Sequence, residues 1–294
     1  MNPKLCEKLL IWLIPVVALL IIFTTLWLWA FKFEPESFSV NHSEVKLQNW
    51  HKVHNHLKIA VLADIHQRKI PDELQRLREI IKATNAEKPD IVVLLGDFIG
   101  RRFDPRKVNA TPEIIAVILK DLQSNYGTYA VLGNHDWWHD GNAVRQALEK
   151  VGITVLENSY IPLTIHGKQL NIIGLPDRTT RHKTLDLSKL PDNKIPSIVL
   201  SHDPDYFEEL ELPYELMLAG HTHGGQVKLP WIGALITPSK YGTKYSEGWF
   251  ERHGKKLFVT RGLGASIIRL RFLCPPEVAI LNISRAEVTT TLSF

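Results

Sequence analysis

Five short apolar runs divide the middle of the chain, and each run ends in polar residues. The runs are rich in Val, Ile and Leu and do not alternate with polar positions, which is typical of strands buried on both faces. They lie within residues 57–66, 91–97, 129–136, 197–203 and 215–223. In open α/β sheets the functional side chains collect beyond the carboxyl ends of the strands, so we expect these polar residues to lie close together.

Helical patterns alternate with the first three runs. Apolar residues at helical spacing predict helices at about 72–84 and 114–122, and a third at about 142–151 with Gly152 as its C-terminal stop. Strands that alternate with helices in this way predict a largely parallel sheet with right-handed crossovers.

Beyond residue 152 the predicted helices become rare. Strand-like runs follow one another at 153–156, 170–174, 198–200, 216–219, 257–261, 278–283 and 288–293. A second, mixed sheet that packs against the first is the simplest arrangement of these strands.

The N-terminal part of the chain differs in composition from the rest. Residues 9–31 are uncharged and apolar, and as a helix they are long enough to span a hydrocarbon core of about 30 Å. We therefore predict a tail at 1–8, a transmembrane helix at 9–31, a polar connector at 32–56 and one globular domain at 57–294. A cleaved signal peptide is the alternative, but the apolar stretch is longer than usual and lacks a small-residue cleavage site.

The charges that flank this segment are few. Lys4 and Lys8 precede it, and Lys32 and Lys46 follow it. The positive-inside rule therefore gives only a slight bias toward an inside N-terminus and an outside domain.

Charge and cysteine content exclude several classes of function. The formal net charge of +4 over 294 residues is modest, and no long basic helix or aromatic–basic interleaving predicts a nucleic-acid partner. Cys6 and Cys274 predict neither a disulfide framework nor a thiolate metal site. No pattern predicts an obligate protein partner.

The ends of the five apolar runs supply residue types that bind divalent metals. A single His after a strand is more often structural than a ligand, but the same chemistry at five run ends is hard to reach by chance. Carboxylate, amide and imidazole groups without thiolates suit Mn, Fe, Zn or Co better than Ca or a cysteine-based structural zinc. The candidate residues are Asp64, His66, Asp97, Asn134, His135, His202, His221 and His223.

These residues form an ordered set of motifs. D-x-H, G-D, G-N-H-D, a single His and G-H-x-H follow one another within residues 57–226, and the set resembles the calcineurin-like metallophosphoesterases. The resemblance implies an enzyme of the α/β class, a two-sheet β-sandwich flanked by helices, here preceded by one N-terminal transmembrane helix. It also implies a phosphate-containing substrate and two divalent metal ions, Mn, Fe or Zn, with Mn favoured.

Carried over by position, the resemblance assigns a role to each residue. It implies one metal held by Asp64, His66, Asp97 and His223. It implies a second metal held by Asp97, Asn134, His202 and His221, with Asp97 as the bridge. His135 matches the catalytic His of the family, which stands beside the scissile phosphate and protonates or stabilises the leaving oxygen.

The residues after the last metal motif narrow the resemblance. G-H-T-H-G-G-Q, the run 237–250, TRGLGAS (260–266) and CPPEVAILNI (274–283) resemble the bacterial membrane-associated branch of the family. That branch includes phosphodiesterases and the membrane-anchored UDP-2,3-diacylglucosamine pyrophosphatase of lipid A synthesis. We expect a single-pass protein of the bacterial inner membrane that hydrolyses a phosphodiester or pyrophosphate bond, in its sharpest form UDP-2,3-diacylglucosamine.

Alternatives to this function remain open. An envelope phosphodiesterase or phosphatase of broad specificity fits the same motifs, and a non-catalytic metal-binding scaffold is the third possibility. The lipid A function requires a cytoplasmic active site, whereas the slight charge bias favours an outside domain. The side of the membrane is therefore left open.

Basic and aromatic residues near the strand ends suggest how a substrate is held. Arg68, Arg101 and Arg102 follow the D-x-H and G-D motifs, where they could bind a second phosphate of a pyrophosphate. Solvated surface charge is the alternative for each of them. Four apolar residues could enter a bilayer or could be ordinary packing: Trp231, Ile232, Trp249 and Phe250.

Overall fold

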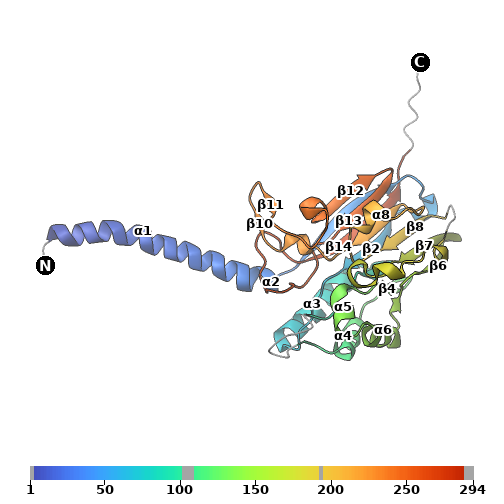
Figure 1. Cartoon of the computed structure of the whole chain (residues 1–294), viewed down its shortest axis with the longest axis horizontal. Helices are drawn as coiled ribbons and strands as arrows, with labels where there is room; N and C mark the ends of the chain where they lie inside the picture. Colours follow the sequence, from blue (N-terminus) through green and yellow to red (C-terminus); the bar gives the residue numbers. More distant parts are fainter. Residues whose placement is uncertain (1–2, 101–108, 192–194, 288–294) are drawn as a thin grey trace, which may run out of the picture.

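A long apolar helix stands apart from the globular part of the molecule in the computed structural model (Figure 1). The structure describes residues 3–100, 109–191 and 195–287. The helix, α1 (Pro3–Leu28), continues through a π-helical turn (Trp29–Phe33) into the short α2 (Glu34–Glu36). Within the described residues, Trp12–Glu36 is the one helix that is long and apolar enough to cross a membrane, judged by length and composition.

The first sheet has the strand order β1-β14-β2-β3-β4-β5. Strands β2 to β5 run parallel, while β14 is antiparallel to β2 and parallel to β1. The strands are β1 (Ser39–Leu47), β2 (Leu57–Leu62), β3 (Ile91–Leu94), β4 (Thr128–Ala130), β5 (Thr154–Val155) and β14 (Glu277–Arg285). One face is covered by the helices α3 (Pro71–Ala86), α4 (Pro112–Leu119) and α6 (Gly141–Lys150).

The second sheet has the strand order β12-β13-β9-β8-β7-β6. Its central strands run parallel, and β12 and β6 at the edges are antiparallel to their neighbours. The strands are β6 (Ser159–Ile165), β7 (Lys168–Gly174), β8 (Ser197–Leu200), β9 (Leu216–Ala219), β12 (Gly248–Arg252) and β13 (Lys255–Val259). Helix α8 (Tyr206–Glu209) and the loops beside it cover the outer face.

An apolar core lies between the two sheets. Ile59 and Val93 of the first sheet and Ile198 and Leu218 of the second are fully buried in it. A second core joins the opposite face of the first sheet to the covering helices through residues such as Leu62. The predicted two-sheet sandwich with flanking helices is therefore confirmed.

The signals that predicted the helices are visible at their ends. Thr111 caps α4 by accepting a hydrogen bond from the backbone N–H of Ile114. Gly152 follows α6 with φ 88°, a left-handed conformation that strains residues with a side chain.

One expectation about the strands is wrong, and the segment predicted as a connector contains a strand. Residues 32–56 are more than a connector, because β1 lies within them and pairs with β14 from Ser39 opposite Glu277 to Leu47 opposite Arg285. Most side chains of β1 are exposed or half-buried, so the segment reads as polar. The runs 153–156 and 278–283 supply β5 and β14 of the first sheet rather than strands of the second. The run 288–293 lies outside the described residues.

Several short elements connect the strands. The helices α5 (Asn134–His139) and α7 (Arg178–Arg181) and the hairpin β10 (Lys228–Leu229) and β11 (Gly233–Ala234) were not predicted. Single 3₁₀ turns occur at Lys52–His54, His182–Thr184, Leu187–Lys189, His223–Gly225 and Gly242–Tyr245. Of these elements, α5 matters most for the site, because it starts at two of the predicted functional residues.

Candidate metal centre

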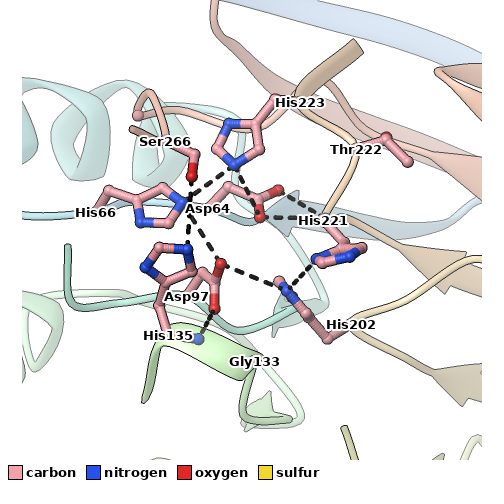
Figure 2. A network of polar contacts seen from close by, with 12 residues as sticks. Asp64, His66, Asp97, Gly133, His135, His202, His221, Thr222, His223 and Ser266 are labelled. Atoms are coloured by element: carbon pink, nitrogen blue, oxygen red, sulfur yellow. Dashed lines mark hydrogen bonds and ion pairs between the residues drawn. The ribbon is translucent and has the colours of Figure 1, made fainter. Parts of the chain in front are cut away.

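The segments that follow five strands meet at one edge of the sandwich. β2 is followed by Asp64 and His66, β3 by Asp97, β4 by Asn134 and His135, β8 by His202, and β9 by His221 and His223. All of these residues are buried, with at most 7% of their surface exposed. Figure 2 shows side chains from these segments converging on one region. The structure therefore brings together every residue that the sequence predicted as a metal ligand or catalytic group.

Left-handed backbone conformations occur at several of these residues. Asp64, His66, Asp97, His221 and His223 all have φ between 45° and 70°. Residues other than glycine seldom adopt this conformation, and such residues are enriched at active sites and in turns.

The first cluster of donor atoms consists of Asp64, His66, Asp97 and His223, whose ligand atoms lie within 4.8 Å of one another. The Nε2 atom of His66 lies 3.0 Å from Nε2 of His223 and 3.5 Å from Oδ2 of Asp97. Nε2 of His223 lies 3.6 Å from Oδ1 of Asp64. Two ring nitrogens and two carboxylates thus face one centre.

The second cluster of donor atoms consists of Asp97, His202 and His221, within the same limit. Nε2 of His202 lies 3.0 Å from Nδ1 of His221 and 3.5 Å from Oδ2 of Asp97. Oδ1 of Asn134 lies 3.1 Å from the same nitrogen of His202, so this amide joins the cluster. Asp97 belongs to both clusters.

Burial and neighbouring charges set the protonation states of the donors. Burial lowers the pKa of His66 to about 4 and that of His221 to about 3, so both rings are neutral and offer lone pairs. Burial opposes ionisation of Asp97, but the imidazole of His202 and its neighbours lower its pKa well below the usual value. Nitrogen and oxygen donors without thiolate, arranged around a shared carboxylate, fit two divalent metal ions.

His202 is protonated, and the positive charge of this proton is one that a bound metal would replace. Burial lowers its pKa, but the carboxylate of Asp97 more than reverses this effect and raises the pKa well above the usual value. A proton on His202 and a bound cation neutralise the same carboxylate. The two therefore compete, and metal binding is expected to release a proton from the site.

His135 lies beside both clusters but is oriented differently from the ligands. Its ring centroid lies 4.7 Å from that of His66, with the two planes nearly perpendicular. Its Nε2 atom lies 3.4 Å from Oγ of Ser266, and its Nδ1 atom is buried without a hydrogen-bond partner among the described residues. The imidazole is thus held at the edge of the site, with Nε2 beside the hydroxyl of Ser266.

Asp136 holds the framework of the site, a role that the sequence analysis did not assign. Its carboxylate accepts hydrogen bonds from the backbone N–H groups of Asp97 at 2.8 Å, Phe98 at 2.9 Å, Ile99 at 3.2 Å and Gly133 at 3.0 Å. One side chain thereby fixes the segment after β3 to the start of α5. The G-N-H-D motif contains this residue, and its fourth position was the available signal.

Arg271 is a second framework residue that the sequence analysis missed. Its fully buried guanidinium donates to the carbonyl oxygens of Arg261, Gly262, Gly264 and Cys274. This closes the loop that passes behind Asp64, where Gly262 has φ 67° and an added Cβ would lie 2.7 Å from Oδ2 of Asp64. No spacing in the sequence marks this arginine.

A pocket of about 380 Å³ opens beside the first cluster. His66, Ser266 and Pro35 of α2 are among the residues that line it. Arg68, predicted to bind a second phosphate, lines the pocket and forms an ion pair with Glu73, which also pairs with Arg269 at 2.9 Å. Arg101 and Arg102, predicted for the same role, lie outside the described residues.

Comparison with known proteins agrees with this geometry. The sequence model of the calcineurin-like phosphoesterase family matches residues 57–225. The chain is 34% identical to the uncharacterized metallophosphoesterase YkuE of Bacillus subtilis, over 77% of this chain and 78% of that protein. It is 32% identical to the phosphodiesterase YaeI of Escherichia coli, over 77% of this chain and 82% of that protein.

A more distant similarity covers more of the chain. The UDP-2,3-diacylglucosamine pyrophosphatase LpxG of Chlamydia trachomatis is 27% identical over 87% of this chain and 92% of that protein. The family match spans the motifs from which both donor clusters are built. The chain therefore belongs to the calcineurin-like phosphoesterase family and is a hydrolase of the metallophosphoesterase type.

Proposed function

We propose that this chain is a membrane-anchored phosphoesterase that uses two divalent metals to hydrolyse a phosphodiester or pyrophosphate bond in a lipid-linked substrate. The observation that carries the proposal is the pair of donor clusters that share Asp97, with His135 beside them. The pocket that runs from His66 to Pro35 adds a path from this centre to the end of the apolar helix.

Each donor has a proposed role in metal binding. The first metal is held by Asp64, His66, Asp97 and His223, and the second by Asp97, Asn134, His202 and His221. Mn is favoured over Fe and Zn, all of which accept this mixture of imidazole nitrogen and carboxylate or amide oxygen. When bound, two such ions supply an attacking water of lowered pKa and neutralise the phosphoryl oxygens.

His135 is the proposed general acid. In the reaction water adds to phosphorus and releases a proton to solvent, the bond from phosphorus to the leaving oxygen breaks, and Nε2 of His135 gives its proton to that oxygen. General acid catalysis of this kind contributes roughly 10²–10⁴-fold to the rate. The hydroxyl of Ser266, 3.4 Å from Nε2, keeps the ring facing the pocket that Ser266 also lines.

The apolar helix is the proposed anchor in a bacterial inner membrane. The most apolar window of Trp12–Glu36 has a mean hydropathy of 2.4, and only 6% of it is buried inside the structure. A helix of this length and composition is stabilised by lipid rather than by water. The side of the membrane on which the domain lies depends on the substrate, and the reporter fusion described below determines it.

Two substrates are supported by different relatives. Similarity to a protein named UDP-2,3-diacylglucosamine pyrophosphatase favours hydrolysis to UMP and a lipid monophosphate, as in lipid A synthesis. Similarity to a protein named phosphodiesterase favours an envelope phosphodiesterase or phosphatase of broad specificity. A non-catalytic scaffold is disfavoured, because such a chain should lack a donor or His135, and this chain has them all.

The test compares substrates on the full-length, Mn-loaded protein. UDP-2,3-diacylglucosamine and bis-p-nitrophenyl phosphate are incubated in parallel, with His135→Ala as the inactive variant and His139→Ala, an exposed His on the same helix, as its matched control. The lipid A function predicts release of UMP and preference for the lipid. Bound metal without hydrolysis of either substrate or of other lipid diesters would favour the scaffold.

Orientation gives an independent test of the lipid A function. A C-terminal reporter fusion shows on which side of the membrane the domain lies. The lipid A function predicts a cytoplasmic reporter. A periplasmic reporter would exclude that function and leave the envelope phosphodiesterase.

A further inference from the structure

Two loops lie at the end of the domain where α1 enters (Figure 1), and both carry large exposed apolar side chains. The first loop includes the hairpin β10–β11, and the second precedes β14. Trp231 is fully exposed, and Ile236 and Ile267 are 76% and 77% exposed. We name this set the apolar loop surface; its members are Leu229, Trp231, Ile232, Leu235, Ile236, Ile267, Ile268 and Leu273. Contiguous exposed apolar residues of this kind mark interaction sites.

The two loops form one unit. The backbone N–H of Lys228 donates to the carbonyl of Phe272 at 2.9 Å, and Phe272 donates in turn to the carbonyl of Gln226. The side-chain carbonyl of Gln226 accepts from the backbone N–H of Ser266 at 2.6 Å, and its amide donates to the carbonyls of Ile268 and Leu270. These hydrogen bonds hold the two loops to each other.

This unit is attached directly to the end of the apolar helix. The backbone N–H of Arg271 donates to the carbonyl of Ala30 at 3.0 Å. The carboxylate of Glu34 accepts from the backbone N–H groups of Leu273 and Cys274. The apolar loop surface is thus held beside the point where α1 would leave a bilayer, and the two apolar regions are continuous.

The stability of the fold does not explain why these exposed positions carry large apolar side chains. Trp231, Ile267 and Leu273 have φ of 64°, 56° and 54°, a left-handed conformation that glycine or asparagine adopts with less strain. Each of them instead carries a large apolar side chain into solvent. Exposing these side chains to water costs free energy, and this free energy is recovered only when they pack against an apolar partner.

Composition and continuity with α1 identify that partner as a bilayer. Segments 226–236 and 264–274 contain no Asp or Glu. Their basic residues are buried or paired: Arg271 is buried, Lys228 pairs with Glu247, and Arg269 pairs with Glu36 and Glu73. Exposed tryptophan and aliphatic side chains are the groups that a protein buries at the lipid interface. A protein partner would not explain why the apolar loop surface is continuous with α1.

The loop surface also adjoins the metal centre. Ser266, 3.4 Å from His135, immediately precedes the exposed Ile267. Ser266, Ile267 and Arg269 line the same pocket as His66. One wall of the pocket is therefore continuous with the apolar loop surface.

We infer that the apolar loop surface inserts into the lipid interface beside α1 and turns the mouth of the pocket toward the headgroups, so that a phosphate on a membrane lipid reaches the metal centre without leaving the bilayer. This inference rests on the anchoring and lipid-linked substrate proposed above. It adds a docking surface and a direction of substrate entry.

Insertion is measured by quenching of a fluorescent label with spin-labelled lipids. Full-length protein in phosphatidylethanolamine–phosphatidylglycerol vesicles carries one label at Trp231→Cys or Ile267→Cys, in a Cys6→Ser background that keeps the buried Cys274. We expect strong quenching by lipids with a shallow spin label. Lys150→Cys, exposed on α6 away from α1, is the matched control and should not be quenched.

A label within α1, at Leu20→Cys, separates failure of the anchor from failure of the docking surface. If Leu20→Cys is quenched by deep spin labels while positions 231 and 267 are not, α1 is anchored and the docking inference is wrong. If Leu20→Cys is not quenched either, the proposed anchoring fails first. Neither reading depends on hydrolysis.

The direction of substrate entry is tested by activity. Replacing Trp231 and Ile232 together by Glu should lower kcat/KM for a lipid-linked diester in vesicles by about tenfold or more, since several buried apolar groups are lost from the interface. Hydrolysis of soluble bis-p-nitrophenyl phosphate should stay within about twofold. Val117→Glu, an exposed apolar residue on α4, is the matched control and should change neither rate. Equal losses on both substrates would overturn the inference.

Discussion

The backbone N–H of His135 donates a hydrogen bond to Oδ1 of Asp97 at 2.9 Å. The residue proposed as general acid thus positions the carboxylate proposed to bridge the metals, and it does so through its main chain. Replacing the imidazole leaves this bond in place. Catalysis and metal binding can therefore be separated by mutation.

His135→Ala should retain both metals and lose turnover. The donors of both clusters are untouched, while the proton donor to the leaving group is removed, so we expect kcat to fall roughly 10²–10⁴-fold. Metal content by mass spectrometry and hydrolysis of a diaryl phosphate check this. His139→Ala should behave as the wild type; loss of metal from His135→Ala would instead make the ring structural.

Asp97→Asn should empty both metal sites, whereas Asp64→Asn should empty one. Asp97 is the donor common to the two clusters, and Asp64 belongs to the first alone. The number of metal ions per chain, measured after dialysis, distinguishes the two variants. Equal stoichiometry in both would show that Asp97 does not bridge.

The sequence predicted the central strands because of how they are buried. Strands such as β3 and β8 are covered on both faces, so they read as continuous apolar runs. β1 is half-exposed, and its partner β14 lies more than two hundred residues away, so neither pattern nor proximity marked it. The sequence therefore shows which strands are buried, but not which strands pair with each other.

The donors were predictable for a similar reason. They follow buried strands directly, so the end of each apolar run located them. Asp136 and Arg271 act on backbone N–H and carbonyl groups, which every residue carries, and no spacing of side chains reveals such a partner. The pairing of Arg68 with Glu73 was likewise invisible, because it depends on how the loop after β2 meets α3.

Asp136→Asn should weaken both the fold and metal binding. An amide offers one acceptor oxygen where the carboxylate serves several backbone donors, and its NH₂ group faces N–H groups. We expect a loss of about 2–4 kcal/mol in the free energy of unfolding and weaker metal affinity. Denaturant unfolding and metal titration check this, with exposed Asp121→Asn as the control that should change neither.

Arg271→Lys should loosen the loop behind Asp64. An ammonium cannot reach the four carbonyls that the guanidinium serves, so buried acceptors lose their partners. We expect about 2–4 kcal/mol of destabilisation and faster hydrogen exchange in residues 260–274. The matched control, Arg252→Lys on the half-exposed edge of β12, should change exchange little. Unchanged exchange in Arg271→Lys would contradict this role.

Glu215 should make stability fall with rising pH. Burial raises its pKa from 4.5 to about 7, so between these values the folded protein binds more protons than the unfolded chain. The cost of ionising this carboxyl is absent below pH 4.5 and complete above pH 7. Relative to the wild type, Glu215→Gln should therefore gain roughly 2–3 kcal/mol between pH 5 and pH 8.

Unfolding curves at several pH values in detergent test this prediction. Exposed Glu211→Gln, in the same loop, is the control and should run parallel to the wild type. Parallel curves for Glu215→Gln and the wild type would show that Glu215 ionises without cost.

The junction between α1 and the domain also sets the mechanics of the molecule. Only Ser37 and Phe38 separate α2 from β1. The guanidinium of Arg76 stabilises this junction by donating hydrogen bonds to the carbonyls of Glu36 and Ser37. A flexible linker of n residues would let a domain wander by about 5–6 Å × √n. With α1 in a bilayer, this short junction would instead restrict the movement of the domain and hold its active site at a fixed distance from the lipid interface.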